Sequence, residues 1–285
     1  MNQVLLYYKY VSVADPETER DAQRELCNSL GLLGRILIGQ EGINGTVAGP
    51  VEATDAYRAA MDEHPLFNNI DYKIDSSDVI PFRKLKVKAR SEIVTLGVPT
   101  DLARTAPHLS PDEFHELVDD PDVVLFDARN NYEAAIGKFR GAITPDINLF
   151  NQLPGVLDNY AELKDKKVVA YCTGGIRCEK ATALMIERGF SKVYQLDGGI
   201  IKYAQKFPNG AFEGECFVFD ERMSVGFTDN PAQLGTCHFC TKPTNQYRNC
   251  ANPTCNDLIL VCQSCNDQAA CGSCCQKLLG QLQAA

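Results

Sequence analysis

The cysteines of this chain are concentrated near its C-terminus. Nine of the thirteen lie between Cys237 and Cys275, and three pairs of them have C-x2-C spacing. Each such pair can present two thiolates to one tetrahedral metal ion, and the segment has few large apolar residues with which to build a core. The spacing therefore predicts a C-terminal region that folds around zinc, with the metal supplying part of the folding free energy.

The ligand spacing predicts one zinc site and leaves the composition of a second open. We expect the first site to use Cys237, Cys240, Cys262 and Cys265. A second would use Cys250 and Cys255 together with Cys271 and either Cys274 or Cys275. An iron–sulfur cluster is the alternative metal assignment, and disulfides would require an oxidising compartment.

The rest of the chain has the composition of an ordinary globular protein. Of its 285 residues, 45% are hydrophobic and 23% are charged, and this length is sufficient for two or three domains. No apolar run reaches the length of a membrane span, and the N-terminus does not resemble a signal peptide. We therefore expect a cytoplasmic protein without membrane contact, in which cysteines are metal ligands or catalytic thiols.

Residues 1–80 alternate strand and helix patterns in the order βαββαβ, which predicts a ferredoxin-like domain. Asp15 and Pro16 have the types expected at the start of the first helix, and Ala22, Leu26 and Leu30 have the spacing of its buried face. A Gly-Ile-Asn-Gly turn at 42–45 is expected between the second and third strands. This fold hosts many functions, so by itself it indicates none.

Residues 81–108 combine a basic strand with a linker. Five of the eight residues from 83 to 90 are basic, and none is acidic, although the net charge of the chain is −9. In an extended conformation the lysines share one face, which is typical either of a protected edge strand or of a track for phosphates. The candidate phosphate-binding residues are Arg83, Lys84, Lys86, Lys88 and Arg90.

Residues 109–215 again alternate strands and helices, which predicts a parallel sheet with its site at the carboxyl ends of the strands. Ser110 and Glu113 have the spacing of a capping box. Asp127, Cys172 and Asp197 each come at the end of a predicted strand. The remaining residues, 216–285, form the cysteine-rich zinc-binding region.

The segment YCTGGIRCEK, 171–180, places Cys172 at a strand-to-helix turn. Glycines that can turn their amides inward, the N-terminus of the following helix and Arg177 each favour a thiolate or a bound anion. We therefore expect Cys172 to be a reactive thiol rather than a buried apolar residue. Cys178 is either a second, resolving thiol or a packing residue of the first helical turn.

Four motifs in this domain resemble those of rhodaneses: DARNNYE (127–133), GKFRGAI (137–143), the six-residue loop from Cys172 to Arg177, and LDGGI (196–200). The resemblance implies a persulfide-carrying role for Cys172. It also implies an anion-binding loop made of Thr173, Gly174, Gly175 and Ile176. One departure is Lys138, where rhodaneses commonly have histidine.

Five motifs along the whole chain resemble those of the bacterial rhodanese-related tRNA uridine hydroxylases. They are EGINGT (41–46), PFRKLKVKARSEIVTLG (81–97), YCTGGIRCEKA (171–181), VFDER (218–222) and CANPTCN (250–256). The resemblance implies oxygen-dependent conversion of the wobble uridine of tRNA to 5-hydroxyuridine. It also implies tRNA as the partner, Cys172 as the nucleophile with Arg177 and Cys178 beside it, and molecular oxygen as co-substrate.

The residues themselves leave the oxygen chemistry open. The four histidines are scattered, and no dinucleotide-binding fingerprint precedes a helix, so neither an iron site nor a nucleotide cofactor is evident. Cys172 would either add to C6 of uracil or act as a persulfide or oxidised thiol. A sulfurtransferase and a non-catalytic RNA-binding protein are the alternative functions, and no motif indicates an obligate protein partner.

Overall fold

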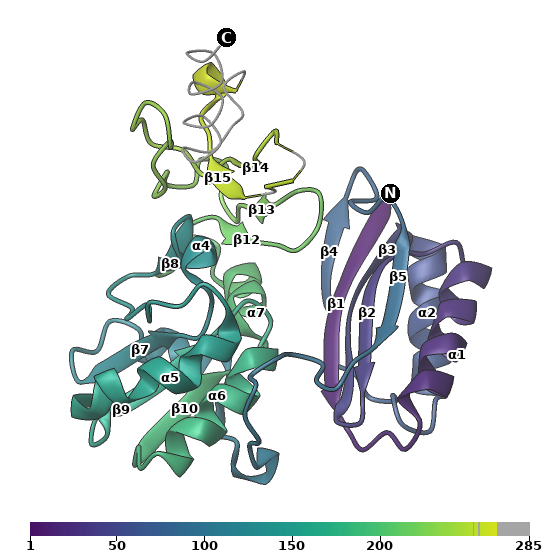
Figure 1. The fold of residues 1–285 in the computed structure, drawn as a ribbon, viewed down its shortest axis with the longest axis horizontal. Coiled ribbons are helices and arrows are strands. Elements are labelled where there is room, and N and C mark those ends of the chain that lie inside the picture. The colour runs from purple at the N-terminus through teal and green to yellow at the C-terminus, as the bar shows by residue number, and fades with distance from the viewer. Residues whose placement is uncertain (253, 256, 267–285) are drawn as a thin grey trace.

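The computed structural model describes residues 1–252, 254–255 and 257–266. Figure 1 shows an N-terminal domain, a central domain and a smaller region above the central domain that leads to the C-terminus. Within the described ranges, none of the helices combines the length and the apolar character that crossing a membrane requires.

The N-terminal domain has the predicted βαββαβ order. Its elements are β1 (Asn2–Tyr10), α1 (Pro16–Ser29), β2 (Leu33–Gly39), β3 (Gly42–Pro50), α2 (Val51–Asp62) and β4 (Lys73–Ser77). The strands are arranged in the order β4-β1-β3-β2 and are extended by β5 (Leu85–Ala89), which pairs with β2 in parallel. The predicted basic strand therefore belongs to this sheet as its edge.

The two faces of the N-terminal sheet have different roles. Helices α1 and α2 cover one face (Figure 1). Buried side chains of alternate strand positions, such as Leu5, Ile36 and Val87, form the core there with Cys27 and Tyr57 from the helices. The opposite face carries the intervening positions and is turned toward the central domain.

Two local predictions in this domain were wrong. Asp15 does cap α1, accepting from the N–H groups of Glu17 and Thr18, but Ala22 is exposed. Leu26 and Leu30 pack partly buried against the core as predicted, and the fully buried residues of α1 are Gln23 and Cys27. Gln23 is tolerated in the core because its Oε1 accepts a hydrogen bond from the Tyr57 hydroxyl at 2.7 Å.

The second wrong prediction is the turn at 42–45. The turn lies at residues 40–41, and the glycines belong to β3. Gly45 is required there by a close approach rather than by a turn, because a Cβ at this position would lie 2.3 Å from Cζ of Tyr7. Glycine in a strand can thus indicate a close contact as well as a turn.

The central domain contains a parallel sheet with strand order β6-β10-β9-β7. Its elements are β6 (His108–Leu109), α3 (Pro111–Leu117), β7 (Val123–Asp127), α4 (Asn131–Ala134), β8 (Gly137–Phe139), α5 (Leu153–Val156), β9 (Lys167–Tyr171), α6 (Ile176–Glu187), β10 (Lys192–Leu196) and α7 (Gly199–Lys206). The predicted capping box of Ser110 and Glu113 begins α3. The parallel sheet and its helices agree with the expectation from sequence.

Short strands follow the central domain. β11 (Phe212–Gly214) pairs with β8, β12 (Cys216–Phe217) with β13 (Ser224–Val225), and β14 (Tyr247–Asn249) with β15 (Leu258–Leu260). Short 3-10 segments lie at Leu102–Arg104, Phe150–Gln152, Leu157–Leu163 and Gln263–Cys265. The last of these segments and the β14–β15 hairpin carry cysteines of the C-terminal region.

Lys180 fastens the two α/β domains together. This side chain projects from α6 and is 4% exposed. Its Nζ lies 2.8 Å from Glu41 and 2.7 Å from Glu92, and it donates to the carbonyl oxygen of Val94 at 3.0 Å. A buried ammonium group is stable only with such partners, so the contact fixes α6 relative to the N-terminal sheet.

Candidate active site and metal site

The strand order brings Cys172 to the carboxyl edge of the central sheet. It follows β9 directly, and the N–H of Gly175 donates to its Sγ at 3.2 Å. Asp127 and Asp197, the other two residues predicted at this edge, are each held by a cationic side chain. Arg129 and Asp127 form a fully buried ion pair, and Asp197 binds Lys202 at 2.6 Å.

The surroundings of Cys172 favour the thiolate. Burial by itself would raise the pKa of this thiol, but four interactions outweigh it: a hydrogen bond from the Cys178 thiol, the charge of Arg177, and hydrogen bonds from the backbone N–H groups of Arg177 and Gly175. Together they lower the pKa of Cys172 to about 6. The side chain is therefore mainly ionised at neutral pH.

Cys178 behaves in the opposite way. Burial, followed by the hydrogen bond to Cys172, raises its pKa well above the ordinary thiol value. Cys178 therefore keeps its proton and donates a hydrogen bond to the Cys172 thiolate. The two thiols are adjacent, with one charged and the other neutral.

Arg177 is held by Glu133, a residue at the end of the DARNNYE motif that sequence reasoning did not count among the site residues. The guanidinium Nη1 and Nη2 lie 2.5 and 2.7 Å from the two carboxylate oxygens, and Nη2 also lies 3.3 Å from the Thr173 hydroxyl. Glu133 is fully buried. This bidentate pair fixes the loop and keeps the positive charge beside Cys172.

Cys172 lines a cavity of about 510 Å³ between the two domains. The central domain contributes the loop residues Thr173, Gly174, Ile176 and Arg177, together with Asn130 and the segment 149–151. The N-terminal domain contributes the open face of its sheet: Leu6, Tyr8, Arg35, Leu37, Asn44 and Thr46. No local sequence signal marks these strand residues, because only the packing of the two domains brings them to Cys172.

The sheet approaches the loop so closely that the loop requires glycine. A Cβ on Gly174 would lie 2.9 Å from Cδ2 of Leu6, and a Cβ on Gly175 would lie 2.8 Å from the Tyr8 hydroxyl oxygen. Gly175 also has a φ of +102°, which other residues rarely adopt. The two glycines thus serve the domain contact as well as the loop conformation.

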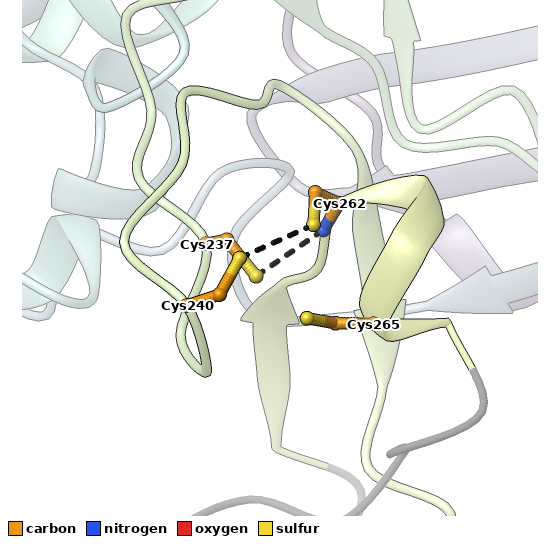
Figure 2. A group of neighbouring side chains, drawn as sticks. All are labelled: Cys237, Cys240, Cys262 and Cys265. Carbon is orange, nitrogen blue, oxygen red and sulfur yellow. Dashed lines mark hydrogen bonds between the residues drawn. The ribbon is translucent and has the colours of Figure 1, made fainter.

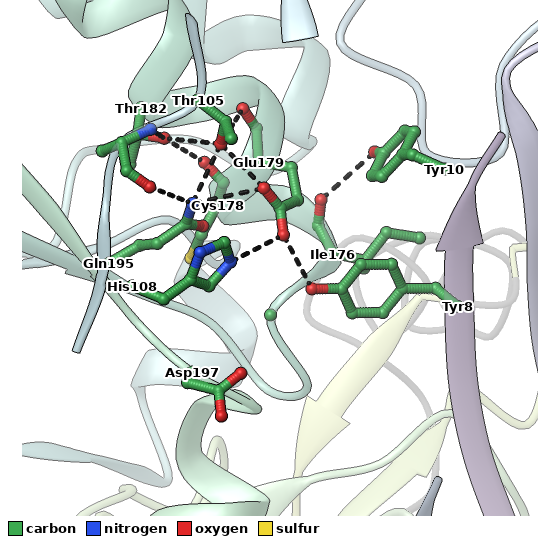
Figure 3. A network of polar contacts seen from close by, with 12 residues as sticks. Tyr8, Tyr10, Thr105, His108, Ile176, Cys178, Glu179, Thr182, Gln195 and Asp197 are labelled. Carbon is green, nitrogen blue, oxygen red and sulfur yellow. Dashed lines mark hydrogen bonds and ion pairs between the residues drawn. The ribbon is translucent and has the colours of Figure 1, made fainter. Parts of the chain in front are cut away.

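A polar network around Glu179 holds the sheet over the loop (Figure 3). The buried carboxylate of Glu179 accepts from the Tyr8 hydroxyl at 3.0 Å and from the Thr105 hydroxyl at 2.7 Å, and it lies 3.0 Å from Nε2 of His108. The Tyr10 hydroxyl donates to the carbonyl oxygen of Ile176 at 3.2 Å. Two side chains of β1 are therefore bonded to the start of α6.

The predicted basic residues line the edge of the same sheet. The side chains of Lys84, Lys86 and Lys88 are exposed, whereas Val87 between them is buried. Arg35 lies opposite Lys86 in the β2–β5 pair. The positive charges of Lys84 and then Arg35 lower the pKa of Lys86, which shows that the charges are close together.

A second cavity, of about 870 Å³, runs beside β5 and shares Arg35 and Phe219 with the Cys172 cavity. Lys84 and Lys86 line it as well. Arg83 also lines it but is paired with Glu221 at 2.5 Å, and the guanidinium of Arg90 donates to the carbonyl oxygen of Ala89. Arg35 was missed from sequence because it is an isolated charge within an apolar strand.

Four of the predicted zinc ligands lie together (Figure 2). The sulfur atoms of Cys237, Cys240, Cys262 and Cys265 all lie within 4.8 Å of one another, and those of Cys240 and Cys262 are 3.5 Å apart. Tetrahedral zinc with Zn–S bonds of about 2.3 Å needs sulfur atoms roughly 3.8 Å apart, so this donor set fits the ion.

The second predicted zinc site is only partly within the described residues. Cys250 is buried in the small core of this region, and Cys255 packs against it. Cys271, Cys274 and Cys275 lie outside the described residues. Their part in a second site therefore stays a prediction from spacing.

Comparison with known proteins agrees with this domain arrangement. Residues 2–93 match the UPF0176 acylphosphatase-like domain, 110–206 the rhodanese-like domain and 213–277 the rhodanese C-terminal model. A protein of Arthrobacter sp. (strain FB24) is 44% identical over 93% of this chain and 94% of its own length. A protein of Corynebacterium urealyticum is 43% identical over 96% of this chain and 97% of its own length. A Bacillus pumilus protein is 46% identical over 89% of this chain and 81% of its own length.

All three relatives carry the name tRNA uridine(34) hydroxylase. The chain belongs to the tRNA uridine(34) hydroxylase family. This membership confirms the resemblance that five separated sequence motifs indicated. In this hydroxylase family member, the acylphosphatase-like domain extends to residue 93. It therefore includes the basic strand β5.

The pKa of Cys172 can be tested by alkylation. We expect iodoacetamide to modify Cys172 with a half-maximal rate near pH 6, because only the thiolate reacts and protonation below that pH removes it. Peptide mass spectrometry resolves each cysteine. Cys178 serves as the internal control and should remain unmodified at the same pH. A midpoint for Cys172 near the ordinary thiol value of about 8.5 would contradict this assignment.

Proposed function

We propose that this protein hydroxylates C5 of the wobble uridine of tRNA, with Cys172 as the nucleophile and molecular oxygen as co-substrate. The observation that carries the proposal is the position of an activated thiolate in a cavity that joins a basic groove. The family name of the relatives supports tRNA as the substrate. A tRNA substrate also supports a cytoplasmic location.

The chemistry follows from the electron-poor C6 of uracil. Addition of the Cys172 thiolate to C6 places negative charge on C5 and O4, so that C5 becomes nucleophilic toward an oxygen species. Loss of the C5 proton and release of the thiolate then restore the ring. Because one atom of O₂ enters the base and the other leaves as water, the reaction consumes two further electrons from a reductant.

The protein groups around Cys172 have separate roles in this scheme. Arg177 supplies charge that stabilises the thiolate, while Glu133 holds Arg177 in place. Cys178 donates a hydrogen bond that stabilises the Cys172 thiolate, both before it adds to C6 and when it is released. The loop N–H groups of residues 173–176 form the anion-binding side of the cavity.

The basic edge of the N-terminal sheet provides a route for the RNA. Lys84, Lys86 and Lys88, with Arg83, Arg90 and the newly found Arg35, can bind phosphates while a single-stranded anticodon base enters the cavity. Extrusion of such a base costs little because it is not paired.

In the C-terminal region, the four clustered cysteines hold a structural zinc ion that fixes the β14–β15 hairpin.

Substitution of the nucleophile tests the reaction. Cys172→Ser keeps the shape of the side chain but not its nucleophilicity, so it should abolish 5-hydroxyuridine while tRNA binding is retained. Nucleoside mass spectrometry of tRNA from cells with the gene, without it and with the variant measures this. A gain of sulfur instead of oxygen at uridine would favour persulfide transfer, and wild-type hydroxylation by Cys172→Ser would exclude the thiol as the catalyst.

The basic strand can be tested by charge reversal. Lys86→Glu with Lys88→Glu should weaken tRNA binding and lower the slope of log Kd against log salt by about 2, because two phosphate contacts are lost. Lys166→Glu with Lys192→Glu, at two exposed lysines of the central domain, changes the net charge equally and is the matched control. Equal effects of the two double variants would show that net charge alone matters.

Metal analysis tests the C-terminal region. Purified protein should contain at least one zinc ion per chain, and Cys237→Ser should lose one ion and unfold this region, because metal binding supplies its folding free energy. Elemental analysis and limited proteolysis measure the two effects. Cys27→Ser, in the N-terminal core, is the control and should retain all zinc. Protein that is free of metal yet resistant to proteolysis at residues 237–265 would refute the site.

A further inference from the structure

We propose that Phe219 is a stacking platform for a nucleobase of the single-stranded RNA segment that enters the Cys172 cavity. This inference rests on the proposed function and assigns a role to the VFDER motif, 218–222, which the catalytic scheme leaves unused. A nucleobase presents a flat π-face that aromatic side chains bind without regard to sequence.

The position of Phe219 is the first argument. It lines the basic groove beside β5, the catalytic cavity, and a third cavity of about 430 Å³ on the other side of Leu6 and Thr173. Phe219 is 48% exposed, and the centroid of its ring lies 6.0 Å from Cζ of Arg177. The groove beside β5 and the Cys172 cavity thus meet at this ring, so RNA that occupies both would lie against it.

The rigidity of the segment is the second argument. Phe219 lies between β12 and β13, where Asp220 binds Arg222 at 2.7 Å and Arg222 also binds Asp75 of β4 at 2.5 Å. On the other side, the N–H of Glu221 donates to the carbonyl oxygen of Pro81 at 3.0 Å. The polar residues of VFDER thus anchor the loop to the N-terminal domain and present the ring in a fixed orientation.

Charge and ring together indicate the occupant. Arg35, Lys84 and Lys86 line the groove on one side of Phe219, and the thiolate cavity lies on the other. Cations that neutralise phosphates next to an aromatic ring that stacks a base are the combination found in proteins that bind single-stranded nucleic acid. A pre-oriented ring also loses little conformational entropy when it binds a base.

Substitutions separate stacking from simple apolar packing. Phe219→Leu keeps apolar area but removes the π-face, and it should lower kcat/KM for tRNA hydroxylation about 5- to 150-fold. Phe219→Tyr retains the π-face, so its kcat/KM should fall much less than that of Phe219→Leu. If Phe219→Leu and Phe219→Tyr have the same kcat/KM as each other while wild-type protein is active, stacking is excluded. Wild-type protein that does not hydroxylate tRNA would instead overturn the proposed function.

Fluorescence gives a direct readout of stacking. The chain contains no tryptophan, so Phe219→Trp introduces a single tryptophan whose emission can be followed. A base stacked on the indole should quench its emission when an anticodon stem-loop RNA is added to Cys172→Ser protein. Leu234→Trp, at an exposed position outside the three cavities, is the matched control and should not be quenched. Equal emission of both variants with and without bound RNA would refute the stacking role.

Discussion

The open face of the N-terminal sheet packs directly against the loop that carries Cys172, and the site depends on this contact. Leu6 and Tyr8 approach Gly174 and Gly175 so closely that no side chain fits between them. Buried polar groups secure the contact, with Lys180 bound to two carboxylates and Glu179 bound to Tyr8. The central domain alone would therefore have a loop but no cavity.

Within that cavity, the electrostatics of the loop oppose the cost of burying a charge. Desolvation alone would keep Cys172 protonated, but the charge of Arg177 and hydrogen bonds from Cys178 and two backbone N–H groups are stronger. Glu133 prevents Arg177 from leaving to bind an incoming anion, because both guanidinium Nη atoms are occupied by its carboxylate. The thiolate is thus stabilised by groups of the protein itself, without any bound ligand.

The N-terminal domain connects this site to a basic surface at the edge of its sheet. Strand β5 places lysines at the sheet edge, β2 adds Arg35, and the loop with Phe219 joins the groove to the cavity. The same sheet therefore forms one wall of the Cys172 cavity and one wall of the basic groove beside it. This arrangement gives a physical reason for combining a rhodanese-like domain with an acylphosphatase-like domain in one chain.

Local patterns in the sequence were sufficient for the order of the domains, the parallel central sheet, the thiol at the turn and the four clustered cysteines, because each is set by periodicity or by residues close together in the chain. The turn at 42–45 was misplaced because Gly45 is required by its close contact with Tyr7 on the neighbouring strand, and not by a turn. Arg35, Glu133, Tyr8 and Phe219 join the site only through folding. Their neighbours in the site come from segments that are distant in the sequence. The spacing of residues within one segment does not show which face of one domain packs against which loop of the other.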